Sequence, residues 1–164
     1  MTPEQSRRAV LRVGGSVLTV GLAGCLGTDT AERWDSDVML AVADAHQFSA
    51  PGCSCCERYA PYLRAHLETP LAVSVPDDIA SVKQRYGIPE GLRSCHTVVL
   101  DDHVVEGHVP VTVIARLLDD DAGIDGVALP GMPAGSPGMG GAKAEPFTFY
   151  VLGGGRTGAV YARV

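Results

Sequence analysis

Three of the five cysteines lie in one four-residue stretch, C-S-C-C at 53–56. Beyond them, tyrosine and leucine side chains recur every fourth residue, which predicts a helix over 55–67 that begins at the thiols. Pro61 lies inside this range and is expected to kink the helix or to delimit its first turn. The free N–H groups and the dipole at a helix N-terminus favour a thiolate over a thiol. The fold must therefore bring a helix N-terminus to these cysteines.

Strand and helix patterns alternate along the rest of the chain. They predict one or two strands over 38–43 and 44–49, later strands over 71–75, 95–100 and 103–109, and helices over 77–86 and 111–118. The order β-α-β-α-β-β-α, with a thiol pair at the start of the first helix, predicts an α/β, thioredoxin-like three-layer domain. A Gly/Pro-rich loop at 126–141 and a C-terminal β-hairpin are expected to follow it.

The N-terminus has the pattern of an export signal. Arg7 and Arg8 precede an apolar run at 13–22 that is too short for a permanent membrane helix. The run ends in L-A-G-C, and this combination resembles a twin-arginine signal with a lipoprotein box. Residues 1–24 are then expected to be removed, and Cys25 to carry the lipid. The alternative is an ordinary apolar helix with a buried cysteine.

Export would set the location and the organisation of the mature protein. A lipid on Cys25 predicts attachment to the outer face of the cytoplasmic membrane, with residues 25–37 as a polar tether and 38–164 as the folded domain. Cysteines in that compartment can oxidise, or can meet metals that the cytoplasm excludes. The formal charge of −6, with lysine only at 83 and 143, leaves no basic face for nucleic acid.

Cys95 and His96 extend the cysteine group. They precede the strand T-V-V-L, and in thioredoxin-like folds the loop that enters this strand packs against the C-x-x-C segment. Thioredoxins carry a cis-proline there, which shields the thiols from metal. Because this chain has S-C-H-T at 94–97 instead, the thiols at 53, 55, 56 and 95 are expected to converge with the imidazole of His96.

The expected ligands favour a soft metal. Thiolate and thioether sulfur select Cu(I), whereas closed tetrahedral Cys/His sites suit zinc. Met132 and Met139, each next to a glycine in the Gly/Pro-rich loop, add two thioethers that zinc would not use well. Copper is therefore the first expectation and zinc the second.

Three motifs together resemble a known family. They are P-G-C-S-C-C, then L-R-S-C-H-T-V-V-L-D-D-H-V-V-E-G-H-V-P, then L-P-G-M-P-A-G-S-P-G-M, within about residues 44–164. This pattern is similar to domain-of-unknown-function family number 411, whose members are commonly described as metal-binding and are often tied to copper resistance. The resemblance implies a metal site drawn from Cys53, Cys55, Cys56, Cys95, His96, His108, Met132 and Met139.

Three functions remain open from the residues. The first is an extracytoplasmic Cu(I)-binding protein that exchanges copper with a donor or acceptor protein. The second is a thiol-disulfide oxidoreductase with Cys53 as nucleophile and Cys56 as resolving thiol. The third is a binding module stapled by disulfides. We favour metal binding over an enzymatic role, with His108 as a ligand or as a residue behind the ligands. The remaining histidines, His46, His66 and His103, are expected at the surface.

Overall fold

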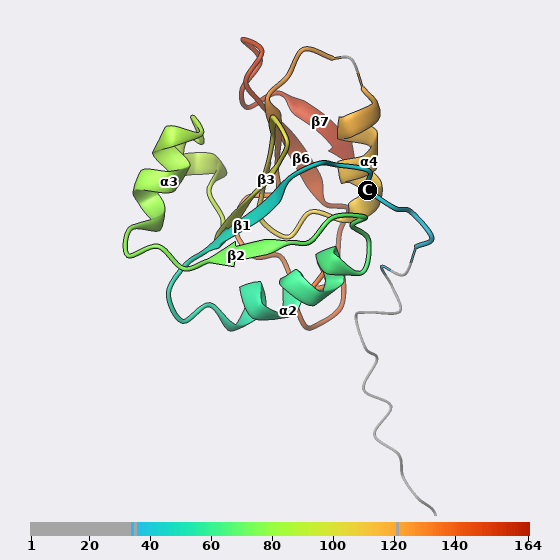
Figure 1. Cartoon of the computed structure of the whole chain (residues 1–164). Coiled ribbons are helices and arrows are strands. Elements are labelled where there is room, and N and C mark those ends of the chain that lie inside the picture. The colour runs from blue at the N-terminus through green and yellow to red at the C-terminus, as the bar shows by residue number, and fades with distance from the viewer. Residues whose placement is uncertain (1–33, 35, 121) are drawn as a thin grey trace, which may run out of the picture.

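The computed structural model describes Trp34, residues 36–120 and residues 122–164. Its elements are β1 (Ala45–Ser49), α2 (Ser54–Arg64), β2 (Ala72–Ser74), α3 (Ile79–Arg85), a 3-10 turn (Glu90–Leu92), β3 (His96–Leu100), β4 (His103–Glu106), α4 (Val111–Asp119), β5 (Gly126–Ala128), β6 (Thr148–Leu152) and β7 (Val160–Arg163) (Figure 1). The mixed α/β class predicted from the sequence is confirmed. The predicted signal at 1–24 and Cys25 lie outside the described residues.

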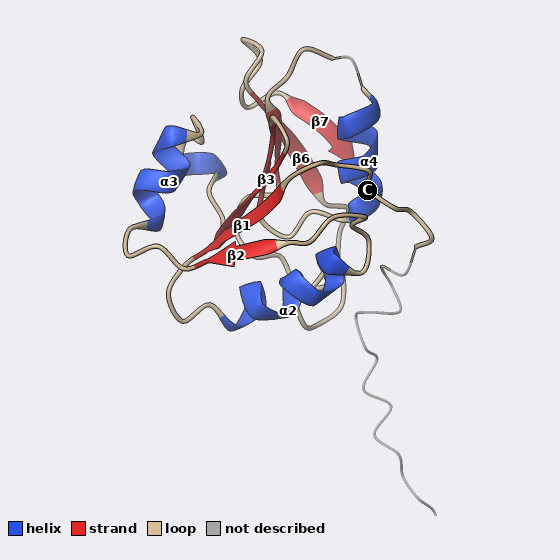
Figure 2. Ribbon diagram, viewed as in Figure 1, coloured by secondary structure: helices blue, strands red, loops and turns tan. Residues whose placement is uncertain are grey.

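All seven strands form one sheet, in the order β2-β1-β3-β4-β5-β6-β7 (Figure 2). The β1–β2 and β4–β5 pairs are parallel, and the other neighbours are antiparallel. The strands β2 and β7 are therefore the two edges of the sheet. Within the described residues, no helix has the length and apolar character that crossing a membrane requires.

Helices cover both faces of the sheet. Successive side chains of a strand point to opposite faces, and here both faces carry apolar side chains that the helices bury. The larger core cluster joins α2 and α4 to one face and includes Tyr59 and Ile114 with Val98 and Val105 of the sheet. The smaller cluster lies on the opposite face, where Ile88 after α3 packs on side chains of β4, β5 and β6. The site-bearing helix α2 is thus fixed to the sheet by a fully buried apolar surface.

The first helix is shorter than predicted. It continues through Pro61 but ends at Arg64, because the next residues turn to meet the chain before β1. Leu40 N–H donates to His66 O at 2.7 Å, and Leu40 and Leu67 form a single parallel bridge. The strand expected over 38–43 is reduced to this bridge, and β1 begins at Ala45.

The strand β5 was not predicted. The sequence places 126–128 in the Gly/Pro-rich loop, but these residues pair with both β4 and β6 and so join the terminal hairpin to the sheet. Gly126 permits the pairing, since a Cβ at this position would lie 1.9 Å from Val104 O. Three residues with one glycine are too short to show a period of two.

Two further side chains differ from expectation. His66 is 7% exposed and its Nδ1 lies 2.9 Å from Val38 O, so its expected surface position is wrong. Trp34, inside the predicted tether, stacks on Phe147 with ring centroids 5.9 Å apart and donates from Nε1 to Gly135 O at 2.7 Å. Contacts with the domain therefore begin before residue 38.

Candidate metal centre

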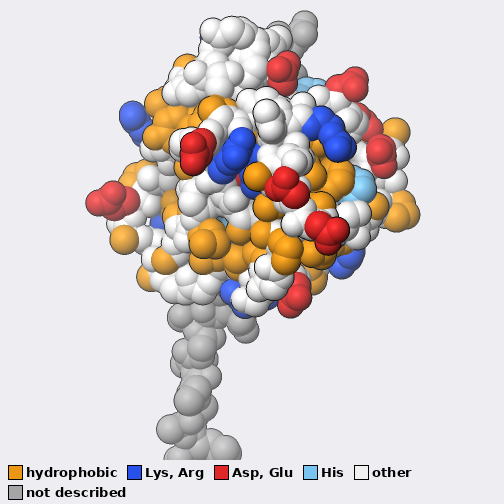
Figure 3. All heavy atoms as spheres, turned by 90° about the vertical axis from the view of Figure 1, so that its left-hand side faces the viewer, with side chains coloured by type: hydrophobic (Ala, Val, Ile, Leu, Met, Phe, Trp, Pro, Cys, Tyr) orange, Lys and Arg blue, Asp and Glu red, His pale blue; other side chains and the backbone are white. Residues whose placement is uncertain are grey.

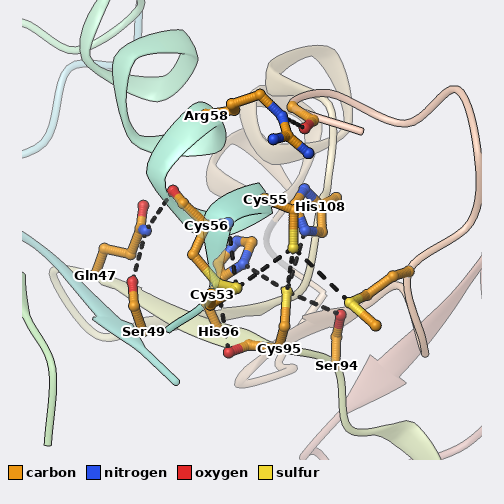
Figure 4. Close-up of a disulfide and its surroundings, with 12 residues drawn as sticks. Gln47, Ser49, Cys53, Cys55, Cys56, Arg58, Ser94, Cys95, His96 and His108 are labelled. Atoms are coloured by element: carbon orange, nitrogen blue, oxygen red, sulfur yellow. Dashed lines mark hydrogen bonds between the residues drawn. A yellow bond between two sulfur atoms is a disulfide. The ribbon is translucent and has the colours of Figure 1, made fainter. Parts of the chain in front are cut away.

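The four cysteines of the folded domain converge at one point. Sulfur atoms of Cys53, Cys55, Cys56 and Cys95 all lie within 4.8 Å of one another (Figure 4). The first three come from the N-terminus of α2, and the fourth comes from the chain that enters β3. Ala50 N–H donates to Cys95 O at 3.1 Å and ties the two segments together across 45 positions of sequence.

Two of these cysteines form a disulfide, Cys53–Cys56, while Cys55 and Cys95 are free thiols. The free sulfurs lie 3.6 Å apart, and Cys55 Sγ lies 3.3 Å from Cys53 Sγ. Cys53 also caps α2, since its sulfur accepts from Cys56 N–H at 3.2 Å. In this oxidised form two thiols are available to a metal, and reduction would make four available.

His108 directs its Nε2 toward Cys95 Sγ, at 3.1 Å. Its Nδ1 lies 2.7 Å from Pro137 O, and because a carbonyl only accepts, the proton is on Nδ1. Burial and then the nearby charge of Arg58 lower the pKa of His108, although the hydrogen bond with Pro137 opposes them. The ring is therefore neutral at pH 7, with the Nε2 lone pair facing Cys95. A backbone carbonyl that holds the second nitrogen is the usual arrangement of a histidine that binds metal.

His96 forms the floor of the site. Its Nδ1 lies 3.4 Å from Cys95 Sγ, and its ring packs against Tyr59 and His108 with centroids 4.5 and 4.7 Å apart. Burial, followed by repulsion from the protonated form of His108 and from the Lys83 ammonium, holds the pKa of His96 well below its ordinary value. Its Nε2 is buried and has no hydrogen-bond partner among the described residues, an uncommon state for a buried polar atom. Cys95 thus belongs to two groups of potential ligands, one of sulfurs and one with both histidines.

The loop after β5 brings one methionine to the cysteines. Met132 Sδ lies 3.8 Å from Cys55 Sγ, and the side chain is 53% exposed, so it covers the site from the solvent side. Met139 is half-buried and its N–H donates to Ser136 O at 2.9 Å. Within the described residues its sulfur has no contact of hydrogen-bond range with a cysteine sulfur, unlike that of Met132. The two loop methionines therefore differ in position.

The same loop lies directly on α2. Arg58 Nε donates to Gly138 O at 2.9 Å, and the loop reaches His108 through Pro137 O. Gly138 has φ +74°, and a Cβ there would lie 2.8 Å from Tyr59 N. Glycine is required at this crossing, because any side chain would lift the loop from the helix and move the carbonyl that orients His108.

A buried ion pair, absent from the sequence prediction, lies behind Cys95. Lys83 Nζ of α3 lies 2.5 Å from Glu106 Oε1 of β4, and both side chains are almost fully buried. Glu106 also accepts from Thr97 Oγ1 at 2.6 Å and from Ser94 N–H at 2.5 Å. Ser94 Oγ in turn donates to Gly131 O, next to Met132. One carboxylate thus positions the residue before Cys95 and, through it, the methionine loop.

The thiol of Cys95 holds its proton when no cation binds it. Burial, followed by the hydrogen bond and the charge of Cys55, raises the pKa of Cys95 to about 12. A soft cation that binds here must displace the proton, so binding is coupled to proton release. The raised pKa makes Cys95 a weak nucleophile when no cation is bound.

These features define a small mixed α/β protein with a half-buried sulfur and imidazole site suited to a soft metal. The profile of the family described as "Protein of unknown function, DUF411" matches residues 92–139, which include the β3 entry and the methionine loop. The comparison with curated proteins found no match.

Two solved structures are similar to this chain. Form 2 of copper resistance protein CopG has 35% sequence identity and a TM-score of 0.67, with 77% of this chain and 98% of that chain covered. Form 1 has 34% identity, the same TM-score and the same coverage. The chain belongs to the DUF411 family, together with these copper resistance proteins.

Proposed function

We propose that this protein binds Cu(I) at the cysteine cluster outside the cytoplasm and acts in copper handling or resistance. The observation that carries the proposal is the convergence of four sulfurs with the Nε2 of His108 around Cys95. Thiolate, thioether and neutral imidazole are soft or intermediate donors, and they prefer Cu(I) over hard cations. The thioether of Met132 beside Cys55 favours copper over zinc, our second choice.

The disulfide implies two states of the site. In the oxidised state the ligands would be Cys55, Cys95 and His108, with Met132 at the opening. Reduction would add the sulfurs at 53 and 56, and this larger set exceeds what one Cu(I) ion takes. Some of the ligands would then serve transfer to a partner protein or hold further ions.

A thioredoxin-like core fits the arrangement of the first seven regular elements. From β1 to α4 they follow the order β-α-β-α-β-β-α, apart from the 3-10 turn, and the thiol pair is at the start of α2. The chain that enters β3 lies against this pair, and none of the described peptide bonds is cis. We infer that Cys95 and His96 stand where the shielding proline of redox-active thioredoxins lies, and that β5 to β7 extend the core.

Export by a twin-arginine signal and lipidation of Cys25 complete the proposal. They would hold the domain at the outer face of the cytoplasmic membrane, where copper is met before entry. The support is the sequence pattern at Arg7, Arg8 and Cys25.

Competitive titration tests the metal proposal. Protein reduced with a phosphine is titrated with Cu(I) and separately with Zn(II) against chelators of known affinity. We expect Cu(I) to bind more tightly than Zn(II), and the variant with Cys53, Cys56 and Cys95 all changed to serine to bind far more weakly. If neither metal binds the protein more tightly than this variant, the proposal is wrong.

The disulfide favours a second candidate function, thiol-disulfide exchange through Cys53 and Cys56. Cys53 is partly exposed, as an attacking thiol must be, and Cys56 is fully buried, as suits a resolving thiol. This function predicts insulin reduction that Cys53→Ser alone abolishes. Activity that survives this substitution would exclude it.

The loop methionines provide a matched pair of variants. We expect Met132→Leu to weaken Cu(I) binding by about tenfold, because one soft ligand at the opening is lost while the apolar volume is kept. Met139→Leu should leave the affinity unchanged, since its sulfur does not contact the cysteines. The dissociation constants from the competitive titration check both. Equal effects of the two substitutions would contradict the assignment of Met132.

A further inference from the structure

A groove of about 230 Å³ opens beside the disulfide, between α2 and the C-terminal ends of β1 and β2. Its lining includes Cys53 and Cys56, the valines Val73 and Val75, and Gln47 on the floor. In the view of Figure 4, Cys55, Cys95 and His108 lie on the other side of the disulfide from Gln47 and Ser49, and neither free thiol is among the residues that line the groove. A molecule in the groove would therefore reach the disulfide without displacing the free thiols.

Gln47 places an unused acceptor beneath the floor of this groove. The side chain is fully buried, and its Nε2 donates to Ser49 Oγ at 2.9 Å and to Cys56 O at 3.1 Å. Because the Cys56 carbonyl only accepts, the amide orientation is fixed, and no residue in the described part of the chain is a partner for Oε1. A buried acceptor of this kind costs free energy unless a donor meets it. This acceptor lies beneath the floor of the groove and is closed to solvent, so the groove's choice of ligand rests on its walls.

The walls of the groove are apolar and open to solvent. Val73 is 42% exposed and Val75 is 60% exposed, at an edge of the sheet. Hydrophobic side chains gather on the side of the molecule where β1 and β2 end and α2 begins (Figure 3). Glu57 and Arg64 of α2 line the same groove with opposite charges. This combination suits a short peptide with its own charged ends and is too small for a folded domain.

Exposure distinguishes the two sulfurs of the disulfide. Cys56 is fully buried, whereas Cys53 is partly exposed and lines the groove. An attacking thiolate therefore has access to Cys53 and not to Cys56, and access decides which sulfur is attacked.

We propose that this groove binds a small cysteine-containing peptide thiol that reduces the Cys53–Cys56 disulfide and so frees two sulfurs for copper. The peptide thiolate bonds to Cys53 Sγ, the Cys53–Cys56 bond breaks, and Cys56 leaves as thiolate. A second peptide thiolate attacks the peptide sulfur of this mixed disulfide, which releases Cys53 as thiolate and an oxidised peptide dimer. Two thiols thus supply the two electrons, and the released protein thiolates take up protons or bind Cu(I). The role in copper binding rests on the proposed function above.

The test compares two thiols on the oxidised protein. Reduced glutathione has amide N–H groups and charged ends, whereas 2-mercaptoethanol has neither. Disulfide loss is measured by alkylation of Cys53 and Cys56 and mass spectrometry. The rate with each thiol is then divided by the rate at which the same thiol reduces a small unstructured disulfide. We expect the glutathione rate to saturate with concentration and the 2-mercaptoethanol rate to stay linear.

Exposed valines at the two sheet edges provide the variants. Val75→Asp should slow the reduction of the disulfide by glutathione by about tenfold, because it removes an apolar wall and adds a charge. The rate of reduction by 2-mercaptoethanol should stay unchanged. Val160→Asp, at the β7 edge where the valine is 49% exposed, should change neither rate. A linear glutathione rate, or a Val75→Asp effect that is absent or equal for both thiols, overturns the proposal.

Copper binding is measured separately on protein reduced with a phosphine, because a phosphine reduces the disulfide without binding in the groove. If Cu(I) binds this protein but glutathione shows no saturation, the groove proposal alone fails. If the rate of reduction by glutathione saturates and Val75→Asp lowers it, the groove proposal is supported. This holds even if Cu(I) does not bind and the proposed function is wrong.

Discussion

Changing Cys95 to serine is expected to lower the affinity of the reduced protein for Cu(I) by more than about 100-fold. Substitution of a residue that only supports a metal ligand lowers metal affinity by less than this. Cys95 is the one cysteine of the cluster that does not come from α2, and its sulfur faces both Cys55 and His108. A serine hydroxyl is a hard, weakly acidic donor that does not replace a thiolate for Cu(I). The competitive Cu(I) titration measures the effect.

The free energy of unfolding of the metal-free variant provides the control. The Cys95 side chain is only half-buried and serine is close to it in size, so the fold should be retained. Cys55→Ser, which keeps Cys95 and both histidines, should cost less affinity than Cys95→Ser. Cu(I) affinity unchanged in Cys95→Ser would show that copper binds without the β3 entry.

The second large effect is expected in folding stability. Glu106→Ala should lower the free energy of unfolding by about 3–5 kcal/mol, because it leaves the Lys83 ammonium buried and without its counter-charge. It also removes the acceptor of Ser94 N–H and of Thr97 Oγ1. Urea unfolding at pH 7 measures the difference.

A double substitution separates the lost charge pair from simple loss of packing. Lys83→Met combined with Glu106→Leu removes both charges and keeps apolar volume, so it should recover most of the stability that Glu106→Ala loses. Glu145→Ala, at an exposed glutamate, should change stability by no more than about 0.5 kcal/mol. A Glu106→Ala effect no larger than this control would show that the ion pair does not stabilise the fold.

Local patterns predicted much of the fold. The helix at the thiols, the paired strands β3 and β4, and helix α4 all appear close to their expected positions, because apolar periodicity and turn residues act over short distances. β5 was missed since its three residues are strand only by pairing with β4 and β6. The end of α2 was misplaced because the Leu40 bridge, a contact between distant residues, decides it.

The candidate site was predicted only in part, and for a similar reason. The motifs named the cysteines, histidines and methionines, but spacing does not show that Met132 reaches Cys55 and Met139 does not. The Lys83–Glu106 pair was invisible because Lys83 is one of several charged residues of an ordinary amphipathic helix, and Glu106 is a single acid in a β-rich segment. Which cysteines pair depends on the spatial relation of Cys53, Cys55 and Cys56, and neighbouring positions in sequence do not determine it.

The most direct test of the copper proposal is anomalous diffraction at the copper edge from crystals of the reduced, Cu(I)-loaded protein. It locates copper without assuming which residues bind it. We predict an anomalous peak within bonding distance of Cys95 Sγ and of at least one cysteine sulfur of α2, with His108 Nε2 still facing it. A copper peak elsewhere on the protein, with the sulfurs of the cluster free of metal, would contradict the account.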